Sequence, residues 1–161
     1  LLEGTGTKIL DTRKTTPGLR LLEKYAVKVG GGENHRIGLY DMILIKDNHI
    51  DYAGGVTAAI TKTKEYLKAK GKNLKIEVEA RTLDEIKEIL TFDVDRILID
   101  NFTPEETKTA VALINGKCKT ESSGGITKES IRAYAEAGVD YISVGALTHH
   151  ISSLDLSLKA F

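Results

Sequence analysis

Short runs of isoleucine, leucine and valine alternate along the chain with longer stretches in which apolar residues recur every three or four positions. The apolar runs predict β-strands at Lys8–Asp11, Met42–Lys46, Lys75–Glu79, Arg96–Asp100, Lys119–Ser122 and Tyr141–Val144. The stretches with helical spacing predict α-helices at Gly55–Lys70, Leu83–Leu90, Pro104–Ile114 and Lys128–Ala137. This alternation predicts a parallel sheet covered by helices.

Local signals mark where several of these helices begin and end. Thr82 is followed three residues later by Glu85, and Thr103 by Glu106, which is the spacing of a capping box. Pro104 falls at the first helical position, where its missing N–H group removes no hydrogen bond. A left-handed C-terminal cap is expected at the glycines that follow three helical stretches, Gly71, Gly116 and Gly138.

The fold class is therefore α/β, and two architectures fit: an open doubly wound sheet or a parallel barrel. A complete barrel of eight units typically needs about 250 residues, whereas this chain has 161. We predict one domain over residues 1–161 that is either an open sheet or an incomplete barrel. Because the chain opens at Leu1 and enters a strand almost at once, we also expect it to be the middle of a longer protein.

The composition is typical of a soluble globular protein, with 41% hydrophobic and 29% charged residues. Lys plus Arg equals Asp plus Glu at 23 each, which argues against a nucleic-acid or membrane-surface binder, since both use a basic excess. No run approaches the roughly 18 apolar residues of a membrane span, and no signal peptide is present, so a cytoplasmic location is the default. The single cysteine, Cys118, excludes an intramolecular disulfide.

Polar and charged residues follow almost every predicted strand at its carboxyl end, where parallel α/β folds bind ligands. These segments are Asp11–Lys14, Lys46–His49, Glu79–Arg81, Asp100–Asn101, Glu121–Gly125 and Gly145–His149.

Cations gather among these strand ends in a chain that is otherwise neutral. They are Arg13, Lys14, Arg36 and Lys46, accompanied by His35. Arginine offers a planar fork to carboxylates and phosphates, and lysine a compact charge. Several cations on one face would repel one another unless an anion were bound there, so we predict an anion site.

Two glycine-containing loops follow the last two strands. Ser122–Gly125 precedes a helix that we expect to begin near Thr127, and Gly145–Thr148 follows the next strand. Glycines let backbone N–H groups approach an anion closely, and barrel enzymes often hold phosphate at these strands.

Glu79 and Asp100 end neighbouring strands and form a candidate carboxylate pair. Such a pair suits Mg²⁺, which prefers oxygen ligands and shares them with substrate phosphates. It could instead stabilise positive charge on a sugar ring, or each carboxylate could pair with a neighbouring cation. Glu77 lies two residues before Glu79, so it faces the same side one layer deeper.

Several motifs, in their order along the chain, resemble those of the quinolinate phosphoribosyltransferase family. The most specific are Asp11–Arg20 (DTRKTTPGLR) and Gly30–Leu39 (GGGENHRIGL). The others are Leu44–His49, Glu77–Glu79, Ile99–Asn101, Glu121–Gly125 and Ser143–Thr148.

The resemblance implies an incomplete α/β barrel preceded, in the family, by an N-terminal α/β sandwich domain that has no counterpart here. It implies the formation of nicotinate mononucleotide, pyrophosphate and CO₂ from quinolinate and phosphoribosyl pyrophosphate, a step of NAD biosynthesis. It further implies a homodimer in which the N-terminal domain of one subunit caps the barrel of the other and adds a basic residue to its site.

The resemblance also implies roles for individual residues. Quinolinate carboxylates would contact Arg13, His35, Arg36 and Lys46. Lys14 and Lys46 would face the pyrophosphate, and Glu79 and Asp100 would hold the ribose hydroxyls and Mg²⁺. The 5′-phosphate would contact Ser123, Gly124 and Gly145, with His149 close by.

Three alternatives stay open. A paralogue associated with molybdenum uptake shares the barrel, although Thr15–Pro17 and His35–Arg36 favour the quinolinate enzyme. A lyase could use Lys46 as a Schiff-base amine. An inactive fragment could only bind a ligand or a partner subunit.

Overall fold

The computed structural model describes all residues, 1–161, and contains one six-stranded parallel sheet in the order β1-β6-β5-β4-β3-β2. The strands are β1 (Lys8–Leu10), β2 (Ile43–Ile45), β3 (Ile76–Ala80), β4 (Arg96–Asp100), β5 (Lys119–Ser123) and β6 (Tyr141–Ser143). Every neighbouring pair is parallel, as predicted. Because β1 and β2 are the two edges and do not pair, the architecture is an incomplete barrel that is open between them.

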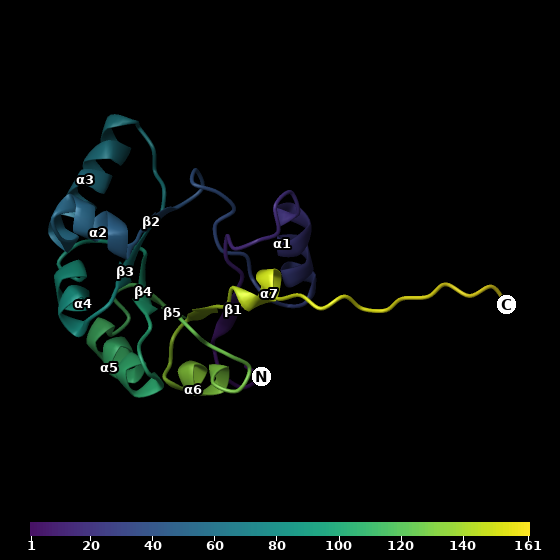
Figure 1. Ribbon diagram of the computed structural model, residues 1–161. Helices are drawn as coiled ribbons and strands as arrows, with labels where there is room; N and C mark the ends of the chain where they lie inside the picture. The colour runs from purple at the N-terminus through teal and green to yellow at the C-terminus, as the bar shows by residue number, and fades with distance from the viewer.

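Helices α2 to α6 cover the outer face of the sheet. The helices of the chain are α1 (Arg20–Val29), α2 (Asp47–Ala53), α3 (Val56–Ala69), α4 (Leu83–Ile89), α5 (Pro104–Ile114), α6 (Ile131–Glu136) and α7 (Ala146–His149). Figure 1 shows α2 to α6 in an arc around the sheet, whereas α1 and α7 lie together beyond β1. The segment between α1 and β2 runs past the open side, where Glu33 forms a single parallel bridge with Leu10 of β1.

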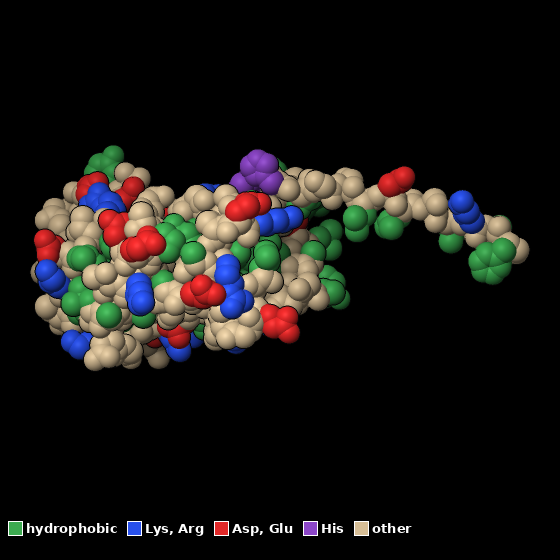
Figure 2. All heavy atoms as spheres, turned by 90° about the horizontal axis from the view of Figure 1, so that it is seen from below, with side chains coloured by type: hydrophobic (Ala, Val, Ile, Leu, Met, Phe, Trp, Pro, Cys, Tyr) green, Lys and Arg blue, Asp and Glu red, His purple; other side chains and the backbone are tan.

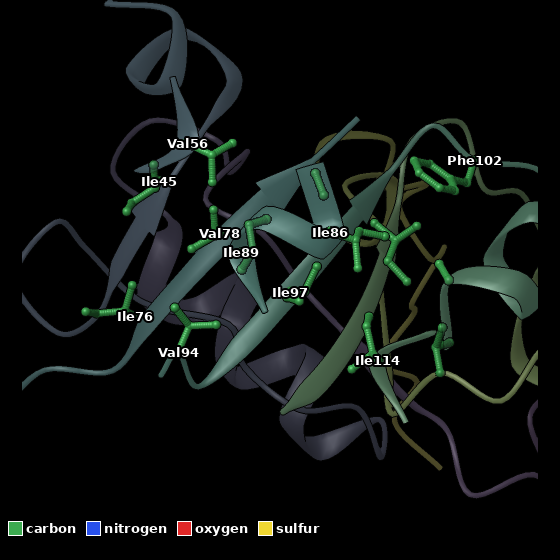
Figure 3. Close-up of a cluster of buried hydrophobic side chains, with 14 of the residues drawn as sticks. Ile45, Val56, Ile76, Val78, Ile86, Ile89, Val94, Ile97, Phe102 and Ile114 are labelled. Carbon is green, nitrogen blue, oxygen red and sulfur yellow. The ribbon is translucent and has the colours of Figure 1, made fainter. Parts of the chain in front are cut away.

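The apolar core lies between the sheet and the helices. Alternate strand residues such as Val78 and Ile97 point outward and pack against Ile86 and Ile89 of α4, as Figure 3 shows. The intervening residues face the opposite side, which we call the inner face, and several of them are charged. Glu77 and Glu121 are completely buried there. The period of two along each strand therefore separates an apolar core from a polar interior.

The helix-end signals are largely confirmed. The Thr103–Glu106 capping box is complete, and the three predicted glycine caps have positive φ. The Thr82 side chain accepts the Glu85 N–H, but the Glu85 carboxylate accepts the backbone N–H of Arg81 instead of that of Thr82.

One predicted helix begins too early. The stretch Lys128–Ala137 is helical only from Ile131 to Glu136. The Ser130 hydroxyl accepts the Thr127 N–H at 3.0 Å, which favours a turn where the sequence predicted the first helical residues. The loop after β5 therefore does not lead directly into a helix.

The surface mixes acidic and basic side chains over the face shown in Figure 2, and residues 150–161 extend from the domain without regular secondary structure. No helix has both the length and the apolar character that a membrane span requires.

Candidate active site

A cavity of about 330 Å³ opens at the carboxyl ends of the strands. Its floor is formed by inner-face residues, with Leu44, Leu98 and Ser143 among them. Its walls carry six of the residues singled out in the sequence: Arg13, Lys14, His35, Arg36, Lys46 and Ser123. A second cavity, of about 370 Å³, lies by β2 and α3 and is lined mainly by apolar residues. The first cavity is therefore where the predicted cations converge.

One buried donor of the cationic wall has no acceptor within the chain. The Nε atom of Arg13 is buried and has no hydrogen-bond partner. Burial and the nearby Arg13 guanidinium lower the pKa of Arg36. Buried donors without partners and like charges that face one another are both unfavourable. An anionic ligand in this cavity would satisfy the donors and relieve the repulsion.

A buried ion pair holds the segment that carries His35 and Arg36. Lys24 of α1 pairs with Asp11 at the end of β1, and their side chains are 3% and 0% exposed. Lys24 Nζ also donates to the His35 carbonyl oxygen at 2.9 Å, while the His35 backbone N–H donates to Asp11 Oδ1 at 2.8 Å. The Asn34 amide donates to the other oxygen of Asp11 at 2.6 Å. Asp11 therefore organises this segment instead of contacting a ligand, and Lys24 was not anticipated.

Both ring nitrogens of His35 are engaged within the chain. Its Nδ1 atom accepts the Arg36 backbone N–H at 2.7 Å. Its Nε2 atom lies 3.0 Å from Glu77 Oε2 and 3.5 Å from Glu121 Oε2. In the neutral ring, the hydrogen therefore resides on Nε2, the nitrogen near the two carboxylates. The ring borders the cavity, but its nitrogens face the backbone and the inner face.

Beneath the cavity lies a layer of charges formed by Glu77 of β3, Arg96 of β4 and Glu121 of β5. Arg96 Nη1 lies 2.6 Å from Glu121 Oε2 and 3.9 Å from Glu77 Oε2, and its guanidinium stacks over the Tyr141 ring at 4.2 Å. Burial opposes the charged form of Arg96, yet the two carboxylates raise its pKa. Burial raises the pKa of Glu77, and burial with the Glu77 charge raises that of Glu121 to about 7.

The same layer brings possible metal ligands together. Ligand atoms of His35, Glu77 and Glu121 all lie within 4.8 Å of one another. Arg96 already supplies a cation to both carboxylates, and His35 has its Nδ1 atom occupied by the backbone. Arg96 balances one of the two carboxylates, and the raised pKa of Glu121 favours a proton on the other; both Glu77 oxygens and Glu121 Oε1 lack a hydrogen-bond partner within the chain.

Glu79 and Asp100 lie on adjacent strands, next to Lys46 and Ser123, which line the cavity. Lys46 Nζ lies 3.4 Å from Glu79 Oε2, and the Asp47 backbone N–H donates to Glu79 Oε1 at 3.2 Å. Burial raises the pKa of Glu79, and the charge of Asp100 adds to this effect. A carboxylate whose charged form is disfavoured, next to a second carboxylate, suits a divalent cation with oxygen ligands, so these residues could hold one.

The glycine-containing loops lie beside these groups. Asp100 and Ser123 are paired in register across β4 and β5. A side chain at Gly145 would begin 2.7 Å from His149 Nε2 and 3.2 Å from Lys14 Cδ, so these three residues adjoin. The Thr148 hydroxyl donates to the Lys14 carbonyl oxygen at 2.7 Å, which connects α7 to the segment after β1. The predicted site residues at the strand ends thus lie together at one end of the sheet, whereas His35 reaches Glu77 within β3 and Arg36 Nη1 donates to the Met42 carbonyl oxygen before β2.

The chain matches known proteins over nearly its whole length. It is 49% identical to the carboxylating nicotinate-nucleotide pyrophosphorylase of Arabidopsis thaliana, named as chloroplastic, over 94% of the chain and 48% of the relative. It is 49% identical to the probable carboxylating nicotinate-nucleotide pyrophosphorylase of Bacillus subtilis, over 98% of the chain and 53% of the relative. The chain therefore spans about half the length of these curated relatives.

A solved structure gives the same result. The nicotinate-nucleotide pyrophosphorylase of Francisella tularensis superposes with a TM-score of 0.91 at 49% identity, over 97% of this chain and 54% of the other. A family model described as the C-terminal domain of quinolinate phosphoribosyl transferase matches residues 1–159. The chain thus belongs to the quinolinate phosphoribosyl transferase family and contains its C-terminal domain.

Proposed function

We propose that this chain is the catalytic domain of an enzyme that joins quinolinate to phosphoribosyl pyrophosphate and releases pyrophosphate and CO₂. One observation carries the proposal: Arg13, Lys14, Arg36 and Lys46 line a single cavity in which the Arg13 Nε atom has no partner. A pyridine dicarboxylate beside a pyrophosphate would supply the anions that this wall lacks. The product, nicotinate mononucleotide, would enter NAD biosynthesis.

Arg13 and Arg36 would bind the two carboxylates of quinolinate. Each guanidinium can form two parallel hydrogen bonds with a carboxylate, which fixes the plane of the pyridine ring. Lys46 would sit between the diacid and the sugar, because it lines the cavity and also approaches Glu79. His35 would act mainly by fixing Arg36, since the His35 ring accepts the Arg36 N–H and faces Glu77.

Phosphoribosyl pyrophosphate would bind along the rim, with Glu79 and Asp100 at the ribose hydroxyls. Ser123, Gly124 and Gly145 would contact the 5′-phosphate, and His149, which adjoins Gly145, would lie close to it. Glu79 and Asp100 would also hold Mg²⁺. When bound, this ion would neutralise charge on the pyrophosphate.

In the reaction, the bond between the ribose carbon and pyrophosphate breaks, and the pyridine nitrogen bonds to that carbon. Lys14 and Lys46 would stabilise the charge on the departing pyrophosphate, and Glu79 and Asp100 the positive charge on the ribose. Fixing the diacid beside the ribose carbon would supply much of the rate. The cationic ring then accepts the electron pair of the adjacent carboxylate as CO₂ leaves, and a proton replaces it.

The proposal also includes a contact with a second subunit, at an apolar surface of helix α1. Leu21, Leu22, Tyr25 and Val29 place an apolar surface of α1 in solvent, with Tyr25 68% exposed. A surface of this kind is typical of an interface. We expect it to contact a second subunit in a homodimer, in which the partner's N-terminal domain adds a basic residue to the site.

The cytoplasmic location stays a prediction, since plant relatives are named as chloroplastic or mitochondrial.

Calorimetric titration with quinolinate, compared with nicotinate, tests the proposal. We expect quinolinate to bind at least tenfold more tightly, because only the dicarboxylate can engage both arginines. Incubation of the complete gene product with quinolinate and phosphoribosyl pyrophosphate should release CO₂ and form nicotinate mononucleotide. Equal affinity for the two acids, together with no product, would exclude the proposed function.

The alternatives give different results in the same experiments. Binding of quinolinate without turnover by the complete gene product would indicate a binding module. Reduction by borohydride of an adduct at Lys46 with a carbonyl substrate would indicate a Schiff-base lyase. The paralogue associated with molybdenum uptake would fail to convert quinolinate.

A further inference from the structure

Asn101 adopts a left-handed backbone conformation directly after β4, with φ of 58°. Apart from glycines, the only other residue with a positive φ is Asn115, which caps the end of α5. Asn101 ends no helix. A left-handed residue outside a cap persists where its surroundings fix it, and such residues cluster at functional sites. Asparagine tolerates this conformation better than most residues, because its short side chain hydrogen-bonds locally.

The Asn101 side chain lies between two parts of the candidate site. Its Nδ2 atom donates to Asp100 Oδ2 at 2.6 Å. On its other side is Gly124, where an added Cβ would lie 2.2 Å from Asn101 Oδ1. The backbone N–H of Asn101 donates to the Ser123 carbonyl oxygen at 2.9 Å. Asn101 therefore contacts both the carboxylate that ends β4 and the loop that follows β5.

We propose that Asn101 is a positioning residue that sets the separation between Asp100 and the Ser123–Gly124 loop. The inference rests on the proposed function, in which Asp100 faces the ribose hydroxyls and the loop contacts the 5′-phosphate. These two groups of a phosphoribosyl substrate are a fixed number of bonds apart, so their subsites need a fixed spacing. Asn101 fills the gap between the subsites and bonds to both sides.

The position also gives a reason for glycine at 124 that does not depend on a bound phosphate. Gly124 has φ of 97°, which few other residues adopt, and a side chain there would collide with Asn101. The loop can therefore approach β4 this closely only with glycine at this place. The Asp100 Oδ1 atom is not used by Asn101 and can face a substrate hydroxyl or a cation.

The test is the substitution Asn101→Gly in the complete gene product. Glycine keeps the left-handed backbone but removes the amide, so the fold should persist. We expect kcat/KM for phosphoribosyl pyrophosphate to fall about tenfold or more, while the dissociation constant for quinolinate stays within about twofold. Asn115→Gly is the matched control, because it makes the same change at the other left-handed asparagine. It should leave both values unchanged.

A double substitution distinguishes a change in the separation between Asp100 and the Ser123–Gly124 loop from a general loss of stability. Gly124→Ala should impair phosphoribosyl pyrophosphate turnover, and this loss should be smaller when Asn101 is already glycine, because one of the colliding groups is gone. Normal kcat/KM for phosphoribosyl pyrophosphate in Asn101→Gly would overturn the inference. An equal loss of quinolinate affinity and of this kcat/KM, together with a lowered melting temperature, would also overturn it. If the unsubstituted protein fails to bind quinolinate or form product, the proposed function is wrong, and this inference fails with it.

Discussion

Lys24 on α1 forms a buried ion pair with Asp11 at the end of β1, and through it the first helix is fixed to the candidate site. The same ammonium group donates to the His35 carbonyl oxygen. The pair therefore connects three segments that are separate in sequence: the end of β1, α1 and the loop before β2. Arg13 and Arg36 lie on the two outer segments, so the geometry of the cationic wall depends on this interaction.

Lys24→Met should destabilise the chain by about 3–5 kcal/mol, because it leaves the buried carboxylate of Asp11 without its partner. Urea unfolding followed by circular dichroism measures this change. Lys28→Met on the same helix is the control, since Lys28 is exposed, and it should change stability by less than about 0.5 kcal/mol. A similar stability for both variants would contradict the importance of the pair.

Glu121→Gln should alter how stability depends on pH. Burial raises the pKa of Glu121 from 4.5 to about 7, in a site faced by Glu77, Arg96 and His35. The folded chain therefore binds a proton between these pH values that the unfolded chain has lost, so the contribution of Glu121 to stability falls as pH rises from 4.5 to 7. With about 1.4 kcal/mol for each pKa unit, this decrease reaches about 3 kcal/mol.

The comparison with the variant isolates this group. Glutamine resembles the protonated acid in shape and does not titrate, so the wild-type chain should lose stability relative to Glu121→Gln across this pH range. Unfolding free energies at pH 4.5, 5.5, 6.5 and 7.5 would give the difference. A constant difference would mean that Glu121 is already ionised at the lowest of these values.

Arg13→Ala should weaken quinolinate binding by about 10- to 100-fold, which corresponds to the 1.5–3 kcal/mol of a hydrogen bond to a charged group. The Nε atom of Arg13 is buried without a partner, so this guanidinium is available to a ligand. Arg132→Ala is a control on the opposite side of the domain, where Arg132 pairs with Glu136. Calorimetric titration of both variants with quinolinate measures this change. Unchanged quinolinate affinity in Arg13→Ala would show that Arg13 does not bind the diacid.

The sequence predicted most of the sheet because its strands are short apolar runs, and those runs fall within a residue or two of the observed strands. Helix α1 was not predicted, although Leu22, Tyr25 and Val29 form an apolar face at helical spacing. That face lies in solvent, whereas Lys24 is buried. Helix α2 begins within the polar Lys46–His49 segment, where the His49 ring accepts the Lys46 backbone N–H. The polar residues that begin α2 offered no such apolar face.

The sequence predicted which strand ends form the candidate site, but not the contacts between the side chains beneath and around it. The two-residue period correctly placed Glu77 one layer beneath Glu79. It gave no indication that Arg96 would lie between Glu77 and Glu121, because that contact depends on the register of three strands. The role of Lys24 was equally hidden, since it requires the packing of α1 against the end of β1.

Glu79→Gln should impair phosphoribosyl pyrophosphate turnover much more than quinolinate binding. Glu79 accepts the Asp47 backbone N–H at 3.2 Å and lies beside Lys46, so glutamine preserves the size of the side chain but removes its charge. That charge is the one that would stabilise the ribose and hold a cation with Asp100. We expect kcat to fall about 100-fold or more while the dissociation constant for quinolinate changes by less than about threefold.

Glu85→Gln is the control for this prediction, because Glu85 pairs with Arg81 on the surface of α4, away from the cavity. A further measurement varies Mg²⁺ at fixed substrate concentrations. If Glu79 holds the ion, the concentration for half-maximal activity should rise in Glu79→Gln and stay unchanged in Glu85→Gln. Equal losses of quinolinate affinity and turnover would instead indicate that Glu79 serves chiefly to orient Lys46 in the diacid site.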